Sequence, residues 1–387
     1  MLAGRVSVVR RVGGGAHASV YRIVALVVGL AIGVAIAQTY VIQRGDVYNA
    51  IYQATFGTSY GATAVLSYAG PLTLTALAFA VGYKVRLWNL GGEGQLFMGA
   101  WAASGIAFTF AGIPGPLLIA LMIVASAIGG ALWVLVPALA RIYLGVTEVV
   151  TTLMLNFVAI LWMVYFALNV WAPTPRAPFI TSKELPTRAE LPPLTLGDVT
   201  IEGGLIIAVG LAVVLAVAFR KTRFGYSVRV TGASQRAAEY AGIPIKRLQL
   251  RMFLLSGALA GLAGGLELVG SVHALSDELS TNTGYNGIAV AVLAGSAFAV
   301  VPLMALVFGG LLAAGNALSL DGLSADATLF LTGLVLLLAA IGESASRFRL
   351  IFAPLRSGTQ LATEPPAVPP PLEGSDRAQT EAAKEPL

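Results

Sequence analysis

Long apolar stretches recur along this chain and are separated by short polar turns. Most of them approach the about 20 residues that a helix needs to cross a bilayer. Glycine is frequent throughout, and small residues let membrane helices approach one another closely. The pattern predicts an all-α polytopic membrane protein with ten transmembrane helices, placed roughly at residues 21–40, 66–84, 92–111, 116–140, 149–171, 204–219, 250–271, 284–299, 302–319 and 327–346.

Two regions near the N-terminus need a separate interpretation. The first apolar stretch follows four arginines, as a secretory signal does, but polar residues 38–40 stand where a small-residue cleavage site would be. We therefore expect a retained first span. Residues 47–68 are only mildly apolar, and we expect them to lie along the outer interface, with a partial span as the alternative.

Composition and charge fix the class and the orientation. The chain of 387 residues is 57% hydrophobic and 11% charged, whereas a soluble domain carries about 25% charged residues. With the N-terminus inside, all but four of the 24 Lys and Arg residues fall on the cytosolic side; the exceptions are Arg44, Arg176, Lys183 and Arg188. The positive-inside rule thus predicts that both termini are cytosolic, and it accounts for the net charge of +5 without nucleic-acid binding.

Polar segments divide the rest of the chain. Residues 172–203 are rich in proline and are expected to form an extracytoplasmic loop, whereas residues 220–250 form the substantial basic loop on the cytosolic side. Residues 1–350 are expected to form the transmembrane domain. Residues 351–387 are rich in Pro, Glu and Ala, and this composition predicts a disordered cytosolic tail.

The first candidate site lies at residues 87–99, where three glycines fall within four residues beside Asn89, Glu93 and Gln95. Glycine permits non-helical backbone, which is tolerated at membrane depth only against protein or a water-filled cavity. A carboxylate placed there marks a functional site by default. The alternative is a structural cap in which Glu93 pairs with Lys84 or Arg86.

The second candidate is a short helix in the basic loop, at residues 233–242. Ser234 can cap its start, and Gly242 followed by Pro244 would end it. Ala237, Ala238 and Ala241 form a small-residue face, which suits insertion into a partner's groove. A plain solvated loop is the alternative.

Two further polar positions interrupt predicted spans. Residues 282–288 place Tyr285 and Asn286 at the opening of a span, and Asn156 is an amide deep inside another. An amide inside the membrane either forms hydrogen bonds between helices or binds a solute, and the sequence leaves both interpretations open. Glu267 and Asn316 are weaker intramembrane candidates.

Signals of catalysis are missing from the sequence. It contains no G-x-x-x-x-G-K-[ST] phosphate loop, the two histidines are far apart, and there is no cysteine for a disulfide or thiol site. A membrane enzyme is therefore poorly supported.

The motif WNLGGEGQLFMGA resembles the F-N-[IL]-G-[AG]-E-G-Q signature of ATP-binding cassette (ABC) importer permeases of the simple-sugar and nucleoside branch, which is related to the branched-chain amino acid permeases. Three later blocks match the same family in order and spacing, at residues 154–157, 232–242 and 284–295. The resemblance covers residues 62–341. The form of the first motif looks most like that of the nucleoside permeases.

The resemblance implies a fold like that of type II ABC importers in a bacterial cytoplasmic membrane. It implies cytosolic ATPase subunits that hold ATP and Mg, so that this chain needs no cofactor, together with an extracytoplasmic solute-binding lipoprotein. A second permease subunit is expected to be a paralogue. Its family role would make the 233–242 helix the coupling element, with contacts from Ser234, Gln235, Arg236, Ala237, Ala238, Glu239, Tyr240 and Gly242.

The resulting hypothesis is a permease for a nucleoside-like solute that moves by alternating access. The solute pathway is expected to pass Asn89, Glu93, Gln95, Asn156, Tyr285 and Asn286, because amides pair with hydroxyls and base edges and an aromatic ring stacks on a base. The main alternative is an ion-coupled secondary transporter, which would need intramembrane charges such as Glu93 and Glu267. A membrane scaffold or sensor without transport is a further alternative.

Overall fold

The computed structural model describes residues 47–174 and 179–320, together with residues 5–10 and 348–353 and four isolated helical positions. The chain divides into a large unit, Gly13–Arg347, and a small unit made of Met1–Val12 and Phe348–Leu387. The spans predicted at 21–40 and 327–346, and the tail beyond residue 353, lie outside the described residues.

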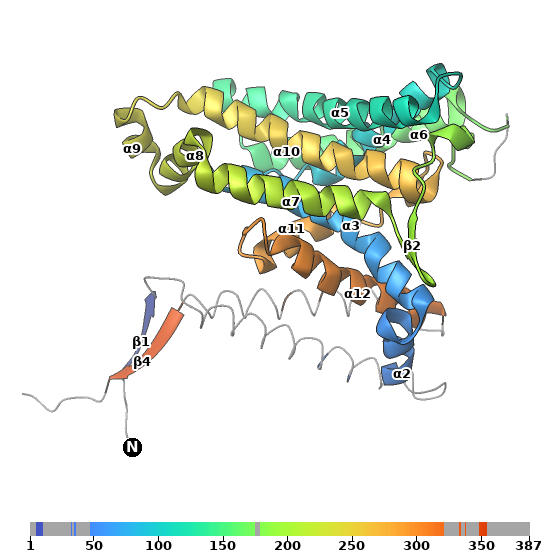
Figure 1. Cartoon of the computed structure of the whole chain (residues 1–387). Coiled ribbons are helices and arrows are strands. Elements are labelled where there is room, and N and C mark those ends of the chain that lie inside the picture. The colour runs from blue at the N-terminus through green and yellow to red at the C-terminus, as the bar shows by residue number, and fades with distance from the viewer. Residues whose placement is uncertain are drawn as a thin grey trace, which may run out of the picture. The chain divides into compact units, whose positions relative to one another are not determined.

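The large unit is helical (Figure 1). Its α-helices are α2 (Val47–Tyr52), α3 (Ser59–Tyr83), α4 (Gly92–Thr109), α5 (Gly115–Leu144), α6 (Glu148–Tyr165), α7 (Gly203–Lys221), α8 (Arg223–Ala233), α9 (Gln235–Tyr240), α10 (Ile245–Glu267), α11 (Thr283–Leu293) and α12 (Val301–Leu320). Short π-helical turns continue three of these regions as η1 (Gln53–Gly57), η2 (Phe166–Val170) and η4 (Leu268–Val272). Two 3-10 turns, η3 (Thr187–Ala189) and η5 (Asp277–Leu279), lie in connecting loops.

Strands are few among the described residues. β2 (Leu194–Leu196) and β3 (Val199–Ile201) form an antiparallel hairpin in the proline-rich loop. In the small unit, β1 (Arg5–Arg10) pairs antiparallel with β4 (Phe348–Ala353). The first three residues of the tail predicted to be disordered, 351–353, thus belong to a strand.

Six described helices are long and apolar enough to cross a membrane: Ser59–Tyr83, Gly115–Leu144, Glu148–Val170, Gly203–Lys221, Ile245–Val272 and Val301–Ser319. Each corresponds to a predicted span. The described residues therefore confirm a polytopic helical membrane protein, and six of the eight predicted spans that they cover are long and apolar enough to cross a membrane.

Two predicted spans take a different form. The helix predicted at 284–299 is wrong in length, because α11 ends at Leu293 after 11 residues, which at 1.5 Å per residue is about half the hydrocarbon thickness. The helix predicted at 92–111 exists as α4, with 18 residues and a polar first turn of Gly92–Gln95. Only α11 is short, and the first turn of α4, Gly92–Gln95, is buried within the folded block.

The expected interfacial segment 47–68 is also corrected. α3 begins at Ser59, where the Thr58 side chain accepts a hydrogen bond from the Gly61 N–H at 3.0 Å. The predicted start at residue 66 was late because the first turns of α3 carry several hydroxyl side chains, which lower their hydropathy.

The helices at the centre of the block are α3 and α10, which are 78% and 72% buried over their apolar windows, against 28% for α5. Glycines bring the backbones together. A Cβ atom on Gly99 of α4 would lie 2.2 Å from the Gly261 carbonyl oxygen of α10, and one on Gly130 of α5 would lie 2.2 Å from that of Gly257. Contacts this close require glycine, as expected for packed membrane helices.

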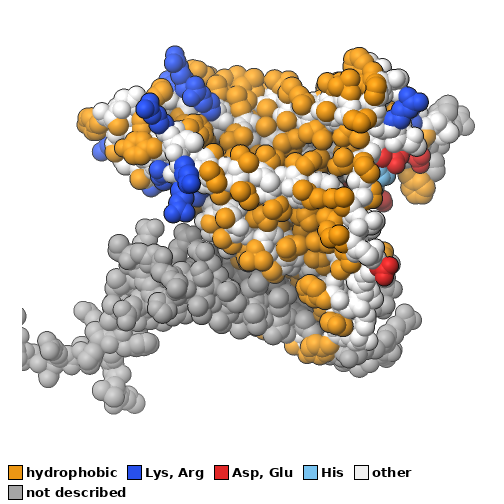
Figure 2. All heavy atoms as spheres, viewed as in Figure 1, with side chains coloured by type: hydrophobic (Ala, Val, Ile, Leu, Met, Phe, Trp, Pro, Cys, Tyr) orange, Lys and Arg blue, Asp and Glu red, His pale blue; other side chains and the backbone are white. Residues whose placement is uncertain are grey.

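Charged side chains separate to the two ends of the block. Figure 2 shows most of the visible lysines and arginines at the end that carries α8 and α9, and acidic side chains together with a smaller basic patch at the opposite end. The visible face between the ends is largely apolar. This distribution agrees with a cytosolic position for the basic end.

Candidate functional site

The connection between α3 and α4, residues 84–91, includes non-helical backbone that is packed inside the helical block. The Leu87 N–H donates to the Gly82 carbonyl at 3.1 Å, so the chain turns back beside the last turn of α3. Residues 87–91 then run without regular secondary structure to the start of α4. Backbone of this kind needs partners from neighbouring elements when water is excluded.

One stripe of α6 supplies these partners, because Glu148, Thr152 and Asn156 lie four residues apart and so share a helix face. The Trp88 N–H donates to Glu148 Oε1 at 3.3 Å and the Leu90 N–H donates to Thr152 Oγ1 at 3.3 Å. The Asn156 amide donates to the Leu90 carbonyl at 3.0 Å. Side chains of α6 thus replace the helical bonds that residues 87–91 lack.

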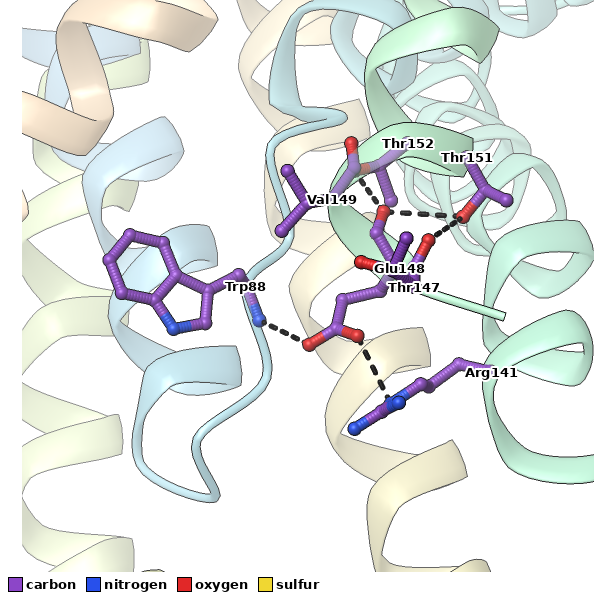
Figure 3. Close-up of polar contacts among 7 residues, drawn as sticks. All are labelled: Trp88, Arg141, Thr147, Glu148, Val149, Thr151 and Thr152. Carbon is purple, nitrogen blue, oxygen red and sulfur yellow. Dashed lines mark hydrogen bonds and ion pairs between the residues drawn. The ribbon is translucent and has the colours of Figure 1, made fainter. Parts of the chain in front are cut away.

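Figure 3 shows how Glu148 is held in this position. Its second carboxylate oxygen forms an ion pair with Arg141 Nε, from the last turn of α5, at 3.0 Å. The Glu148 side chain is 8% exposed. Charge-assisted hydrogen bonding at a largely buried carboxylate offsets its desolvation, and α5, α6 and the α3–α4 connection are joined at this point.

Asn156 joins three segments. Its Oδ1 accepts a hydrogen bond from the Gly94 N–H of α4 at 2.9 Å, and its Nδ2 also donates to the Tyr285 hydroxyl of α11 at 2.9 Å. The side chain has no exposed surface. In this conformation Asn156 therefore links helices through hydrogen bonds. The sequence had left open whether this amide links helices or binds the solute.

Asn89 and Gln95 form a reciprocal pair. Each side-chain amide donates to the oxygen of the other at 2.9 Å. Asn89 also donates to Ser256 Oγ of α10 at 2.8 Å, and that hydroxyl donates to the Ala78 carbonyl of α3. The pair fastens the start of α4 to both central helices.

Glu93 lies where the beginnings of α4 and α11 meet. Its Oε2 accepts a hydrogen bond from the Gly284 N–H at 2.7 Å, and the residue is 3% exposed. A carboxylate at a helix N-terminus is stabilised by the free N–H groups and the helix dipole. Glu93 is thus a cap, but the expected partners are wrong: it caps α11 and pairs with neither Lys84 nor Arg86.

The structure brings together five of the six residues predicted for the pathway around the starts of α4 and α11. These five are Asn89, Glu93, Gln95, Asn156 and Tyr285. The sixth, Asn286, is half-buried, and its amide donates to the Thr281 carbonyl of the preceding loop at 3.5 Å. The sequence missed Glu148 and Thr152, although their spacing from Asn156 was visible.

The predicted short helix of the basic loop is present as α9. The Ser234 hydroxyl accepts from the Ala237 N–H at 3.3 Å, as expected of an N-cap, and Gly242 follows the helix with φ +70°. The expected alanine face is wrong in one position, because Ala238 is fully buried while Ala237 and Ala241 are exposed. Tyr240 is 94% exposed.

The sequence interpretation missed α8, the helix before α9. Thr222 caps it by accepting from the Gly225 N–H at 3.1 Å, so a threonine directly after the apolar run of α7 was the available signal. Arg86 binds the end of α8: its Nε donates to the Gly232 carbonyl at 2.9 Å and its guanidinium also donates to the Ala233 carbonyl at 3.2 Å.

The contact between α8 and the α3–α4 connection is close. A Cβ atom on Gly232 would lie 2.2 Å from the Lys84 carbonyl oxygen. Arg86 has φ +61°, a left-handed conformation that costs a non-glycine residue about 1 kcal/mol and is offset here by its bonds to the helix end. Burial lowers the pKa of the neighbouring Lys84 ammonium, whose Nζ lies 5.3 Å from the Phe298 ring centroid.

Comparison with known proteins identifies the class. Residues 61–340 match the family described as branched-chain amino acid transport system / permease component, and the chain belongs to this family. It is therefore the permease component of an ABC transporter, a multi-pass protein of the cytoplasmic membrane, and it lacks ATPase activity of its own. The family resemblance expected from the sequence is confirmed.

Curated relatives cover most of the chain. The nucleoside ABC transporter permease protein NupB of Lactococcus lactis is 30% identical over 82% of this chain and 90% of its own length. The guanosine ABC transporter permease protein NupP of Bacillus subtilis is 30% identical over 75% and 83% of the two chains. The glucose ABC transporter permease protein TsgB13 of Haloferax volcanii is 32% identical over 81% and 84%. No solved structure matches significantly.

Replacing Asn156 with leucine tests its role between helices. Asn156→Leu keeps a similar volume but leaves the Leu90 carbonyl and the Gly94 N–H without partners, and each buried group left unpaired costs about 1–3 kcal/mol. We expect the midpoint temperature of thermal unfolding in detergent to fall by several degrees. Asn169→Leu is the matched control, because Asn169 is exposed on the same helical segment. An equal midpoint for the two variants would contradict the role.

Proposed function

We propose that this chain is a permease subunit that imports nucleosides by ATP-driven alternating access. The observation that carries the proposal is family membership, combined with nucleoside and guanosine permeases that match three quarters or more of the chain. The glucose permease relative supports a simple sugar as the second candidate. A nucleoside contains a sugar, so both candidates share hydroxyl groups.

The solute route is proposed to pass the starts of α4 and α11. Both helices begin inside the block instead of at its surface, and broken helices of this kind place backbone polar groups at membrane depth. Asn89, Glu93, Gln95, Asn156, Tyr285 and Asn286 surround these starts. Several of their present bonds run between helices, as those of Asn89, Glu93 and Asn156 do, so a solute would meet these groups only after the helices part.

The coupling surface is proposed to be α9 with its flanking residues. The exposed residues of this surface, at the basic end, are Ser234, Gln235, Arg236, Ala237, Glu239, Tyr240 and Gly242. Ala238 is buried and anchors α9 to the rest of the block. An ATPase subunit that moves α9 would also move α8. Arg86 carries that displacement to the α3–α4 connection, and from there to the start of α4.

The same relatives also support a proposal for the other subunits of the transporter. Two permeases of Lactococcus lactis, NupB and NupC, and two of Bacillus subtilis, NupP and NupQ, all match this chain. These pairs support a paralogous second permease subunit. We further propose separate cytosolic ATPase subunits, an extracytoplasmic solute-binding lipoprotein and cytosolic termini.

Uptake measurements test the function directly. Labelled adenosine, guanosine, uridine and ribose would be offered to cells with and without this chain, and to cells carrying Glu239→Arg. We expect nucleoside uptake that disappears in the deletion and in the variant, because the substitution reverses a charge on α9. Uptake that survives Glu239→Arg but collapses with the ion gradient would contradict an ATP-driven mechanism, and ribose uptake alone would replace the nucleoside.

Substitution of Arg86 tests the coupling route. Arg86→Met removes both bonds to the end of α8 while keeping a long side chain, so we expect ATP hydrolysis by the assembled transporter to continue while uptake falls at least tenfold. Arg247→Met is the matched control, since Arg247 is an exposed arginine at the same end. The measurement is the ratio of solute transported to ATP hydrolysed in proteoliposomes. A ratio equal to that of the control would contradict the route.

A further inference from the structure

A polar cavity lies at the acidic end of the block, away from α8 and α9. Its volume is about 350 Å³, and its walls are α3, the end of α10 and the loop that leads to α11. The volume is at the lower end of the range for small-molecule sites, about 300–1,000 Å³. Its polar lining residues are Tyr60, Thr63, Ser67, Tyr68, Glu267, Ser271, Glu278, Thr281 and Thr283.

One face of α3 forms a wall of this cavity. Tyr60, Thr63, Ser67 and Pro71 recur at helical spacing and all line it. Pro71 has no N–H, so the Ser67 carbonyl four residues earlier lacks its helical partner. The wall therefore contains a backbone carbonyl without its usual helical donor, beside side-chain hydroxyls.

Glu267 provides the strongest indication of a ligand. Its Oε2 is shielded from solvent and has no hydrogen-bond partner among the residues that the structure describes. Nearby Ser271 does not serve it, because the Ser271 hydroxyl donates to Glu202 at 3.1 Å. An unpaired carboxylate oxygen at this depth is costly, and a solute that donates a hydrogen bond would satisfy it.

The remaining groups favour a neutral solute. Tyr68 accepts a hydrogen bond from the Asn316 amide, which leaves its own O–H free to donate or to turn into the cavity. Glu278 adds a second, exposed carboxylate at the rim. Carboxylates accept from sugar hydroxyls and amino groups, but they repel phosphate.

We propose that this cavity is the first binding site for the solute in the permease, open to the extracytoplasmic side, and that it selects neutral polyhydroxylated molecules against their phosphorylated forms. The proposal rests on the proposed import function and names the chemistry of its entry site. Glu267 and the Ser67 carbonyl accept hydrogen bonds from the solute. Tyr60 and Tyr68 offer ring faces for stacking.

The absence of cysteine from the chain makes this testable by site-directed labelling. Ala64→Cys places a thiol in the cavity wall, and Thr281→Cys provides a second position in its lining. Leu196→Cys, on the exposed β2–β3 hairpin, is the control. The assembled transporter in sealed vesicles would be treated from the outer side with membrane-impermeant cationic and anionic methanethiosulfonates, with and without adenosine or glucose.

Two results are expected. The cationic reagent should react roughly tenfold or more faster than the anionic one at the cavity thiols, and Glu267→Gln with Glu278→Gln should abolish this preference. Adenosine or glucose should slow labelling at the cavity but not at Leu196→Cys. Labelling without charge preference, or without protection by any solute that the same vesicles import, would overturn the proposal.

Uptake measured in the same vesicles distinguishes a failure of the proposed function from a failure of the proposed cavity site. If glucose both slows labelling of the cavity thiols and is taken up, the cavity remains the proposed binding site and glucose replaces the nucleoside as the substrate. Nucleoside uptake without protection would retain the proposed function and reject the cavity.

Discussion

The structure depends on satisfying the backbone of residues 87–91 inside a block of membrane helices. Most backbone groups of residues 88–90 lack helical partners, and each unpaired group in a membrane interior costs several kcal/mol. Three side chains of α6, at positions 148, 152 and 156, provide the missing donors and acceptors. Because the partners lie on one helical stripe, α4 can begin only where that stripe places it.

The same constraint connects the two ends of the proposed mechanism. The α3–α4 connection contacts the end of α8 through Arg86, and it leads directly into the start of α4, where Glu93 caps α11. A displacement of α8 therefore cannot occur without straining bonds near both broken helices. Membership in a family of ABC transporter permeases favours ATP-driven transport over the ion-coupled alternative, and the proposed source of that displacement is a separate ATPase.

Much of this arrangement was visible in the sequence, in particular the glycine-broken motif with Asn89, Glu93 and Gln95. Hydropathy gave the long spans because full burial in lipid requires continuous apolar sequence. It failed for α11, whose apolar run continues past Leu293 although the helix ends there, and for the start of α3, where hydroxyl side chains line a cavity.

Other features could not be predicted because their partners are distant in sequence. Glu148 and Thr152 look like ordinary residues at the start of an apolar helix until residues 88–90 lie beside them. Glu93 accepts from a backbone N–H 191 residues away, so the alternative in which it pairs with Lys84 or Arg86 is wrong. Arg86 resembled any other basic residue at a cytosolic span end.

The most direct test of the account is hydrogen–deuterium exchange of the transporter assembled with its ATPase, with and without a non-hydrolysable ATP analogue. We expect nucleotide to change exchange at residues 84–94 together with α8 and α9, while the β2–β3 hairpin stays unchanged. A change confined to α8 and α9, with residues 84–94 unaffected, would contradict it.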